Sequence, residues 1–168
     1  MSASTRPWNS PVIVPFRPDL APAFTQLNRA WIERFFALEE ADWKVLVDPA
    51  AAIIAAGGQI FFALDGEMPI GTAAALRVSS DRYELAKMAV EPTHQGRGIG
   101  QLLGEAVIQF ARDAGARTVF LLTNSSLAGA IRLYERLGFT HHQPLPSNTE
   151  YSRADVYMEL DLHEEAVE

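Results

Sequence analysis

A glycine-rich turn between an apolar segment and a periodic helical segment constrains this chain more than any other feature. The turn is Gln95-Gly96-Arg97-Gly98-Ile99-Gly100, and it follows an apolar run from Leu85 to Val90. Glycine lets the backbone approach a ligand closely and adopt conformations that are closed to other residues. Successive backbone N–H groups can then point at one anion, and the N-terminus of the following helix adds a partial positive charge. The sequence therefore predicts a site for a phosphate-bearing cofactor at a strand-to-helix turn.

Apolar periodicity predicts the elements on both sides of this turn. A helix is expected from Ile99, because apolar residues recur on one helical face until Gly115 ends it. Asp19 is expected to cap an earlier helix, and Ser125 or Ser126 a later one. The other expected elements are strands over 11–16, 60–64, 70–78, 83–90, 119–122 and 156–162, a hairpin turn at 65–66, and helices over 19–35 and over 39–47 or 39–56.

This order of elements predicts the fold class. The strand, helix and strand over 83–122 form a crossover that makes a local parallel pair, whereas hairpins are antiparallel. We expect an α+β fold with α/β/α layers, in which a central mixed, mostly antiparallel sheet has helices on both faces. A length of 168 residues favours a single domain over 1–168, with residues 1–10 and 163–168 as flexible tails.

Composition narrows the classes of function. Fourteen Lys and Arg against 21 Asp and Glu give a net charge of −7, which argues against a general nucleic-acid binder. No apolar run is long enough to span a bilayer and no signal peptide is recognisable, so we expect a cytoplasmic protein without a membrane partner. The absence of cysteine removes thiolate metal sites, and His141-His142 has no acidic ligand set, so no metal is expected. A homodimer is left open.

Two common cofactor motifs do not match the turn. A Rossmann fingerprint needs G-x-G-x-x-G and an acidic residue that closes the next strand. Here the third glycine comes one residue early, and the next strand ends in Thr123-Asn124. A P-loop needs Gly-Lys-Ser/Thr, which is absent.

The turn instead resembles the Q/R-x-x-G-x-G/A signature of the GNAT superfamily, the acetyl-CoA-dependent N-acetyltransferases. Lys87 to Pro92 resembles the family's strand that pairs with the pantetheine arm, and Arg132 to Phe139 resembles its late helix with a Tyr-x-x-x-Gly-Phe ending. Over residues 83–142 the sequence motifs resemble those of the family. Over residues 11–80 the resemblance lies mainly in the order of helices and strands. It implies the GNAT-like acyl-CoA N-acyltransferase fold, acetyl-CoA as cosubstrate, and cofactor contacts from Met88, Ala89, Val90, Gln95, Gly96, Arg97, Gly98, Ile99, Gly100, Asn124 and Tyr134.

Acetyl transfer to an amine needs few residues. The acceptor must be neutral to attack, yet an alkylamine is protonated at neutral pH. The resemblance implies Glu84 as the general base and Tyr134 as the acid that protonates the departing thiolate. The alternatives are a solvated carboxylate at Glu84, a packing role for Tyr134 and a strand-end turn role for Asn124. Trp31 and Phe35 are assigned to core packing by their helical spacing, with an acceptor pocket as the alternative.

Three functions follow as hypotheses. The first is an N-acetyltransferase that moves an acetyl group from acetyl-CoA to a primary amine of a small molecule or peptide, by direct attack on the thioester. The second is a catalytically idle, CoA-binding GNAT-like sensor or interaction module. The third, a nucleotide-dependent enzyme that uses the same turn for another cofactor, is disfavoured by the early third glycine and the missing ribose carboxylate.

Overall fold

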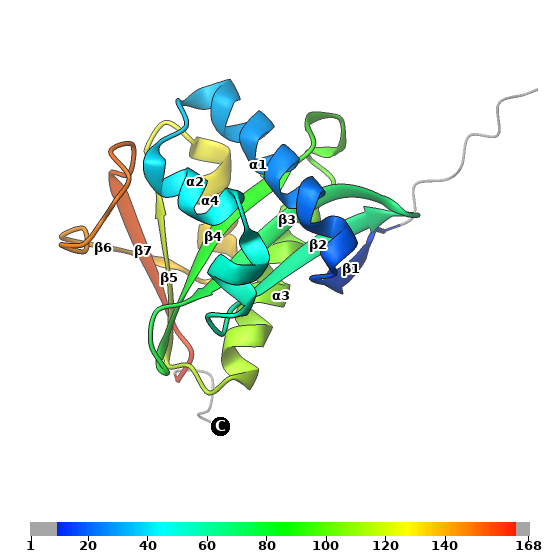
Figure 1. The fold of residues 1–168 in the computed structure, drawn as a ribbon. Coiled ribbons are helices and arrows are strands. Elements are labelled where there is room, and N and C mark those ends of the chain that lie inside the picture. Colours follow the sequence, from blue (N-terminus) through cyan, green and yellow to red (C-terminus); the bar gives the residue numbers. More distant parts are fainter. Residues whose placement is uncertain (1–9, 164–168) are drawn as a thin grey trace, which may run out of the picture.

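The fold is built on one seven-stranded sheet, described here for residues 10–163 in a computed structural model (Figure 1). The strand order is β1-β2-β3-β4-β5-β7-β6, and only the β4–β5 pair is parallel. The mixed, mostly antiparallel sheet is therefore confirmed. The strands are β1 (Val12–Pro15), β2 (Gln59–Asp65), β3 (Met68–Arg77), β4 (Arg82–Val90), β5 (Thr118–Thr123), β6 (Thr140–His142) and β7 (Val156–Asp161).

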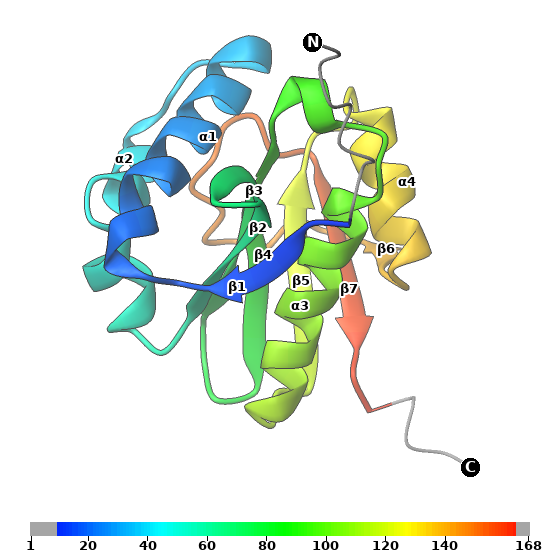
Figure 2. The same ribbon diagram turned by 90° about the vertical axis from the view of Figure 1, so that its right-hand side faces the viewer.

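Helices cover both faces of the sheet, as expected. Figure 2 shows α1 and α2 on one side, and α3 and α4 on the other. The helices are α1 (Ala21–Phe35), α2 (Glu40–Leu46), α3 (Ile99–Asp113) and α4 (Ala128–Arg136), with 3-10 turns at Pro18–Leu20 and Pro92–His94 and a π-helical turn at Ala50–Ile54. The tails expected at 1–10 and 163–168 lie outside the described residues, apart from Ser10 and His163.

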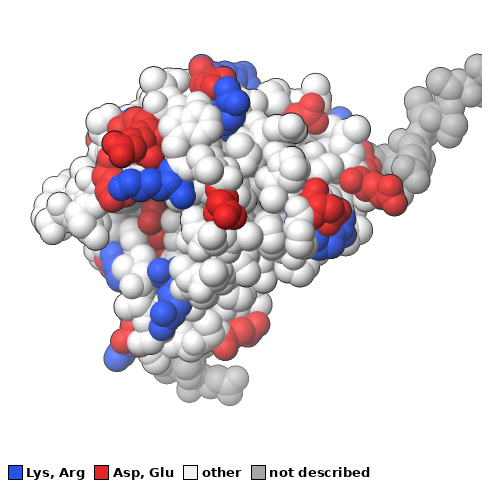
Figure 3. All heavy atoms as spheres, viewed as in Figure 1, with Lys and Arg blue, Asp and Glu red and all other residues white. Residues whose placement is uncertain are grey.

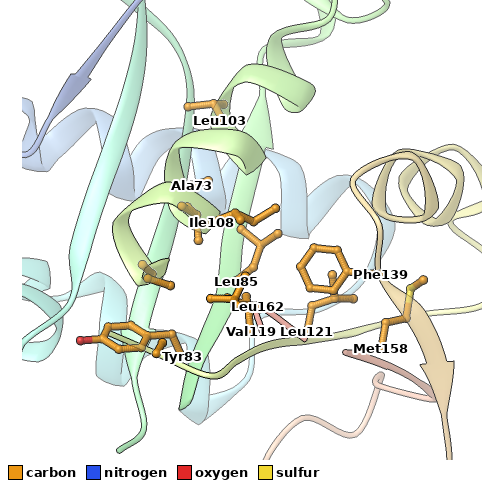
Figure 4. Close-up of a cluster of buried hydrophobic side chains, with 14 of the residues drawn as sticks. Ala73, Tyr83, Leu85, Leu103, Ile108, Val119, Leu121, Phe139, Met158 and Leu162 are labelled. Atoms are coloured by element: carbon orange, nitrogen blue, oxygen red, sulfur yellow. The ribbon is translucent and has the colours of Figure 1, made fainter. Parts of the chain in front are cut away.

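Each face of the sheet has its own hydrophobic core. In β2, Ile60, Phe62 and Leu64 pack beneath α1, whereas Ala63 packs beneath α3. This alternation follows from the two-residue period of a strand. Figure 4 shows the core beneath α3, which includes Leu85, Leu103, Ile108, Val119, Leu121, Phe139 and Met158.

The parallel β4–β5 pair is short, and this creates the opening in which the site lies. Cα partners are limited to Arg82–Glu84 against Thr118–Phe120, so the two strands separate beyond Glu84. In the same stretch β4 carries a bulge, because Lys87 and Met88 together oppose the single residue Ala73 of β3. Lys87 takes a φ of 54°, which is uncommon for a side chain other than glycine. A bulge of this kind bends a strand and redirects its side chains.

Two local expectations about helix ends are wrong. The Asp19 carboxylate accepts hydrogen bonds from Arg17 and caps no helix. Ser125 and Ser126 bond to Asp155 and Asn124 rather than to the start of α4. In each case a nearby polar group competes for the side chain that the helix end was expected to use.

The first of the two ranges predicted for the second helix, 39–47, is confirmed, because α2 runs from Glu40 to Leu46 between caps at Glu39 and Val47. Helix α2 ends at Leu46 and a π-helical turn follows at Ala50–Ile54. Pro49 explains the break, since proline lacks an N–H and disfavours helical geometry in the residue before it. Asp48 Oδ1 accepts a hydrogen bond from the N–H of Ala51 and so starts the new turn.

The surface carries mixed charge on the face in Figure 3, where Lys and Arg side chains are interspersed with Asp and Glu. Between residues 10 and 163, no helix combines the length and the apolar character needed to cross a bilayer. The single-domain organisation expected from the length stays a prediction.

Candidate active site

The glycine-rich turn has the backbone conformation that its sequence predicts. Gly96 and Gly98 both have φ of 79°, in the left-handed region that favours glycine, and α3 begins at the next residue, Ile99. A Cβ atom at either glycine would have no heavy atom of another part of the protein within 4 Å. These glycines are therefore required by backbone conformation and leave open space in front of the turn.

A groove of about 1540 Å³, counted up to its open mouth, runs along this turn. We call it the loop groove; it is lined by the turn, the first turn of α3, the end of β4 and residues 126–136. Of the cofactor residues predicted from the sequence, the groove brings together Met88, Val90, Gln95, Gly96, Gly98, Ile99, Gly100 and Tyr134. Ala89, which is buried, and Arg97 are not among its lining residues.

Gly100 has a second reason to be glycine. A Cβ atom there would lie 2.8 Å from Cδ2 of Leu133, and one at Gly104 would lie 2.5 Å from Cδ1 of Leu137. Both leucines belong to α4 or its C-cap. The two glycines on α3 thus let α4 pack closely, which places α4 as one wall of the groove.

A second cavity of about 660 Å³, including its mouth, lies on the α1 side of the sheet. We call it the α1 pocket; its walls come from α1, β4, the end of β5 and residues 151–154. It shares Trp31, Met88, Leu127 and Tyr134 with the loop groove. The two cavities therefore meet at Tyr134 and Met88. Trp31 and Phe35 line cavities rather than the core, so their assignment to core packing is wrong.

Glu84 faces the α1 pocket from β4. Its neighbours Tyr83 and Leu85 are buried beneath α3, so the alternation of the strand turns Glu84 to the opposite face. No group between residues 10 and 163 hydrogen-bonds its carboxylate. Burial raises the pKa of Glu84 to about 7, although the charges of Lys87 and Arg82 act in the opposite direction. A solvated surface carboxylate, the alternative at this position, would keep a pKa near 4.3.

Tyr134 stands where the two cavities join. Its ring packs edge-on against Phe139, with ring centroids 6.3 Å apart. Burial raises the pKa of Tyr134 to about 12, so the hydroxyl stays protonated at neutral pH. Within the described part of the chain the hydroxyl has no hydrogen-bond partner, which leaves it available to a ligand.

Asn124 lines the α1 pocket rather than the loop groove, and its side chain is already engaged. Nδ2 donates to the carbonyl of Arg153 at 2.7 Å, and Oδ1 accepts from the N–H and hydroxyl of Ser126 at 2.9 and 2.6 Å. These bonds favour the turn role over the cofactor role, which stays a prediction.

An ion network that the sequence did not reveal forms one wall of the α1 pocket. Lys87 Nζ lies 2.6 Å from Asp42 Oδ1 and 3.1 Å from the hydroxyl of Tyr151. Arg153 donates to both carboxylate oxygens of Asp42, at 2.9 and 2.6 Å, and to Glu39 at 3.0 Å. Burial opposes ionisation of Asp42, but the hydrogen bonds from Arg153 and Lys87 outweigh it and lower its pKa to about 2. Burial also lowers the pKa of Lys87.

The network joins three segments that are remote in the sequence. Asp42 lies in α2, Lys87 in the bulge of β4, and Tyr151 and Arg153 in the segment between β6 and β7. The one local signal was the spacing of Glu39 and Asp42, which form a reciprocal capping box at the start of α2. Because Asp42 holds all three segments, the network fixes the walls of the pocket around Glu84.

A family model described as "Acetyltransferase (GNAT) family" matches residues 18–139. Among curated proteins, N-acetyltransferase 8B of Rattus norvegicus is 38% identical over 88 residues, which are 49% of this chain and 40% of that protein. N-acetylaspartate synthetase of Rattus norvegicus is 31% identical over 105 residues, 60% of this chain and 35% of that protein. The chain thus matches less than half of the length of these relatives.

Solved structures share the fold. An acetyltransferase of the GNAT family from Staphylococcus aureus Mu50 has a TM-score of 0.81 at 18% identity, over 90% of this chain and 98% of that one. A putative acetyltransferase from Salmonella typhimurium, solved with its cofactor acetyl-CoA, has a TM-score of 0.74 at 24% identity, over 95% of this chain and 98% of that one. The fold expected from the sequence is confirmed by these neighbours.

Proposed function

This chain belongs to the GNAT family of acetyltransferases, and on that premise we propose that it transfers an acetyl group from acetyl-CoA to a primary amine by direct attack on the thioester. The observation that carries the proposal is the junction at Tyr134. There a groove with a glycine-rich anion turn opens into a pocket that holds Glu84, whose carboxylate has no hydrogen-bond partner within residues 10–163.

The loop groove is suited to the CoA part of the cosubstrate. The glycine-rich turn and the start of α3 can present backbone N–H groups to a pyrophosphate, and the helix N-terminus favours its negative charge. From Leu85 to Val90 the edge of β4 has no partner in β5, so its backbone groups can bind the amides of the pantetheine arm. Acetyl-CoA supplies an acetyl group on a thioester, a good acyl donor.

The α1 pocket is suited to the acceptor. An alkylammonium group must lose a proton before its nitrogen can attack, and Glu84 accepts that proton directly or through one water molecule. A base with a pKa of about 7 is half ionised at neutral pH, and its basicity suits it to accept a proton from the alkylammonium group.

The cytoplasmic location expected from the sequence stays a prediction.

Acetyl transfer forms one bond, breaks one bond and moves three protons. The amine nitrogen bonds to the carbonyl carbon, and the carbon–sulfur bond breaks. Tyr134 donates its hydroxyl proton to the departing thiolate and regains a proton from water. Glu84, after passing the first proton to water, accepts the second proton lost by the nitrogen. The products are an amide and CoA with a free thiol, and the proton held by Glu84 passes to water.

A CoA-release assay tests the proposal. The purified chain is given acetyl-CoA with polyamines, amino acids, aminoglycosides and peptides, and free thiol is measured against time. We expect amine-dependent release of CoA together with an acetylated product in mass spectra. If calorimetry shows acetyl-CoA binding but no amine supports turnover, the chain is the idle CoA-binding module instead.

A further inference from the structure

Asn28 in α1 is a buried polar residue whose bonding is incomplete. Between residues 10 and 163 the buried polar side chains are Asn28, Asp42 and Thr72. Thr72 donates to the carbonyl of Phe61 at 2.8 Å, and Asp42 is held by the ion network. Asn28 Nδ2 donates to the carbonyl of Phe24 at 3.0 Å, but no group in this part of the chain donates to Asn28 Oδ1.

The free oxygen of Asn28 opens into the α1 pocket. Every described side-chain nitrogen or oxygen that is cut off from solvent has a hydrogen-bond partner. Oδ1 has none, so it must be the part of this side chain, exposed by only 1% overall, that reaches accessible space. Asn28 lines the α1 pocket together with Glu84. The bond to Phe24 also orients the amide, because only the nitrogen can donate to a carbonyl.

An asparagine at this position costs stability. Asparagine is less favourable than alanine or leucine in the interior of a helix. Leucine has a similar size and would fill the same space without a polar atom. An Oδ1 that opens into the pocket is instead an acceptor that a ligand can use.

We propose that Asn28 binds the acceptor amine, its Oδ1 accepting one N–H of the attacking nitrogen while the nitrogen's other N–H faces Glu84. The inference rests on the proposed function, because it concerns the same pocket. A neutral primary amine has two N–H bonds and one lone pair, so it can serve both residues while its lone pair faces the thioester. A secondary amine has a single N–H and cannot serve both. Asn28 thus makes the pocket selective for primary amines.

The test compares a primary amine with its N-methyl derivative. The amine is the one that gives the fastest CoA release with the wild type, and kcat/KM is measured for both compounds with the wild type and with Asn28→Leu. We expect the variant to lose about five- to tenfold in kcat/KM for the primary amine, as one hydrogen bond of ordinary strength allows. The N-methyl compound should be little affected, so the preference for the primary amine shrinks by the same factor.

Two controls separate this role from a structural one. Asn28→Leu should bind acetyl-CoA as the wild type does and should melt at the same or a higher temperature, because the carbonyl of Phe24 keeps its helical partner. Gln26→Leu makes the same change of amide to hydrocarbon on the exposed side of α1 and should leave the preference unchanged. Asn28→Ala removes the amide without adding bulk and should reproduce the loss.

The outcomes are distinct. The inference is supported if the ratio of kcat/KM for the primary amine to that for its N-methyl derivative falls in both Asn28 variants and stays unchanged in Gln26→Leu. An unchanged preference in the Asn28 variants overturns it, while CoA release by the wild type leaves the proposed function standing. If the wild type releases no CoA with any amine, both proposals fall together.

Discussion

The loop groove and the α1 pocket are built in different ways, although they meet at Tyr134. The groove depends mainly on backbone conformation within a few consecutive residues, with glycines at 96 and 98 and the start of α3. The pocket depends on side chains from four separate segments, and buried charges link two of them, β4 and residues 151–154, through Asp42 of α2. We infer that the groove tolerates side-chain changes but not changes of backbone conformation, and that the pocket has the opposite sensitivity.

Replacing Glu84 with glutamine tests the chemistry of the pocket and should have the largest effect. If Glu84 is the base, the rate at neutral pH falls by about 10²–10⁴-fold, because glutamine accepts no proton. Raising the pH should partly restore the rate, since more of the acceptor is then neutral. Rate profiles against pH with one saturating amine measure both effects. Equal, parallel profiles would mean that Glu84 is not the base.

Replacing Asp42 with alanine tests the frame of the pocket. The change removes the carboxylate that pairs with the buried charges of Lys87 and Arg153, although Arg153 keeps its pair with Glu39, and such a loss destabilises a protein by about 3–5 kcal/mol. Denaturant unfolding measures the loss. Glu150→Gln is the control, because its pair with Lys44 is more than half exposed and should contribute less than about 1 kcal/mol. A similar small loss in both variants would mean that the network does not hold the pocket.

Replacing Tyr134 with phenylalanine tests the junction. The ring keeps its contact with Phe139, so acetyl-CoA affinity should change little. Turnover should fall by about 10²-fold or less, the low end for general acid catalysis, because a thiolate leaves readily. Single-turnover and steady-state rates, compared with calorimetry, separate the two effects. Unchanged turnover with chemistry rate-limiting would assign Tyr134 to packing.

The stability of Glu84→Gln should depend on pH in a defined direction. The folded pKa of Glu84 is about 7 against an ordinary 4.5, so ionising it costs folding free energy as the pH rises through this range. Above pH 8 the variant should therefore be more stable than the wild type, by about 3 kcal/mol. At pH 4 the gain should vanish. Asp42 acts oppositely: its contribution is lost as the pH falls from 3.8 towards 2. Melting temperatures across pH measure both effects. A difference in melting temperature between Glu84→Gln and the wild type that stays constant with pH would contradict the burial of Glu84.

Replacing Gly98 with valine tests the groove, and its expected effect is the smallest. A β-branched residue at φ of 79° is strained by about 1–3 kcal/mol and places a side chain where the pyrophosphate approaches. Acetyl-CoA affinity should fall by about tenfold or more, or about 1.4 kcal/mol. Gly115→Val is a matched control, because Gly115 has φ of 83° and equally open surroundings at the other end of α3. Equal affinities in the two variants would remove the turn from the cofactor site.

The same contrast explains what could be predicted from the sequence. The groove follows from local patterns: the strand, the turn and α3 are consecutive, and their periodicity and glycines are visible in one stretch. The pocket arises from contacts across long separations, such as Arg153 with Asp42, which are 111 residues apart. No local pattern marks Asn28 or Arg153, and the capping-box spacing of Asp42 predicts the start of a helix rather than a pocket wall. The serines before α4 mislead for the same reason, because Asp155 competes for one of them from 30 residues away.

The short β4–β5 pairing has a mechanical consequence. Strands β1 to β4 form one half of the sheet and β5, β7 and β6 the other, and the backbone pairing between the halves is limited to three pairs of residues of β4 and β5. This seam lies at one end of the strands, so a small rotation about it translates into a larger displacement at the far end, where the cavities meet. The molecule is therefore expected to behave as a hinge with a built-in gap. Changes that strengthen the pairing of β4 and β5, rather than changes to either cavity, would most directly limit how far the two strands can separate beyond Glu84.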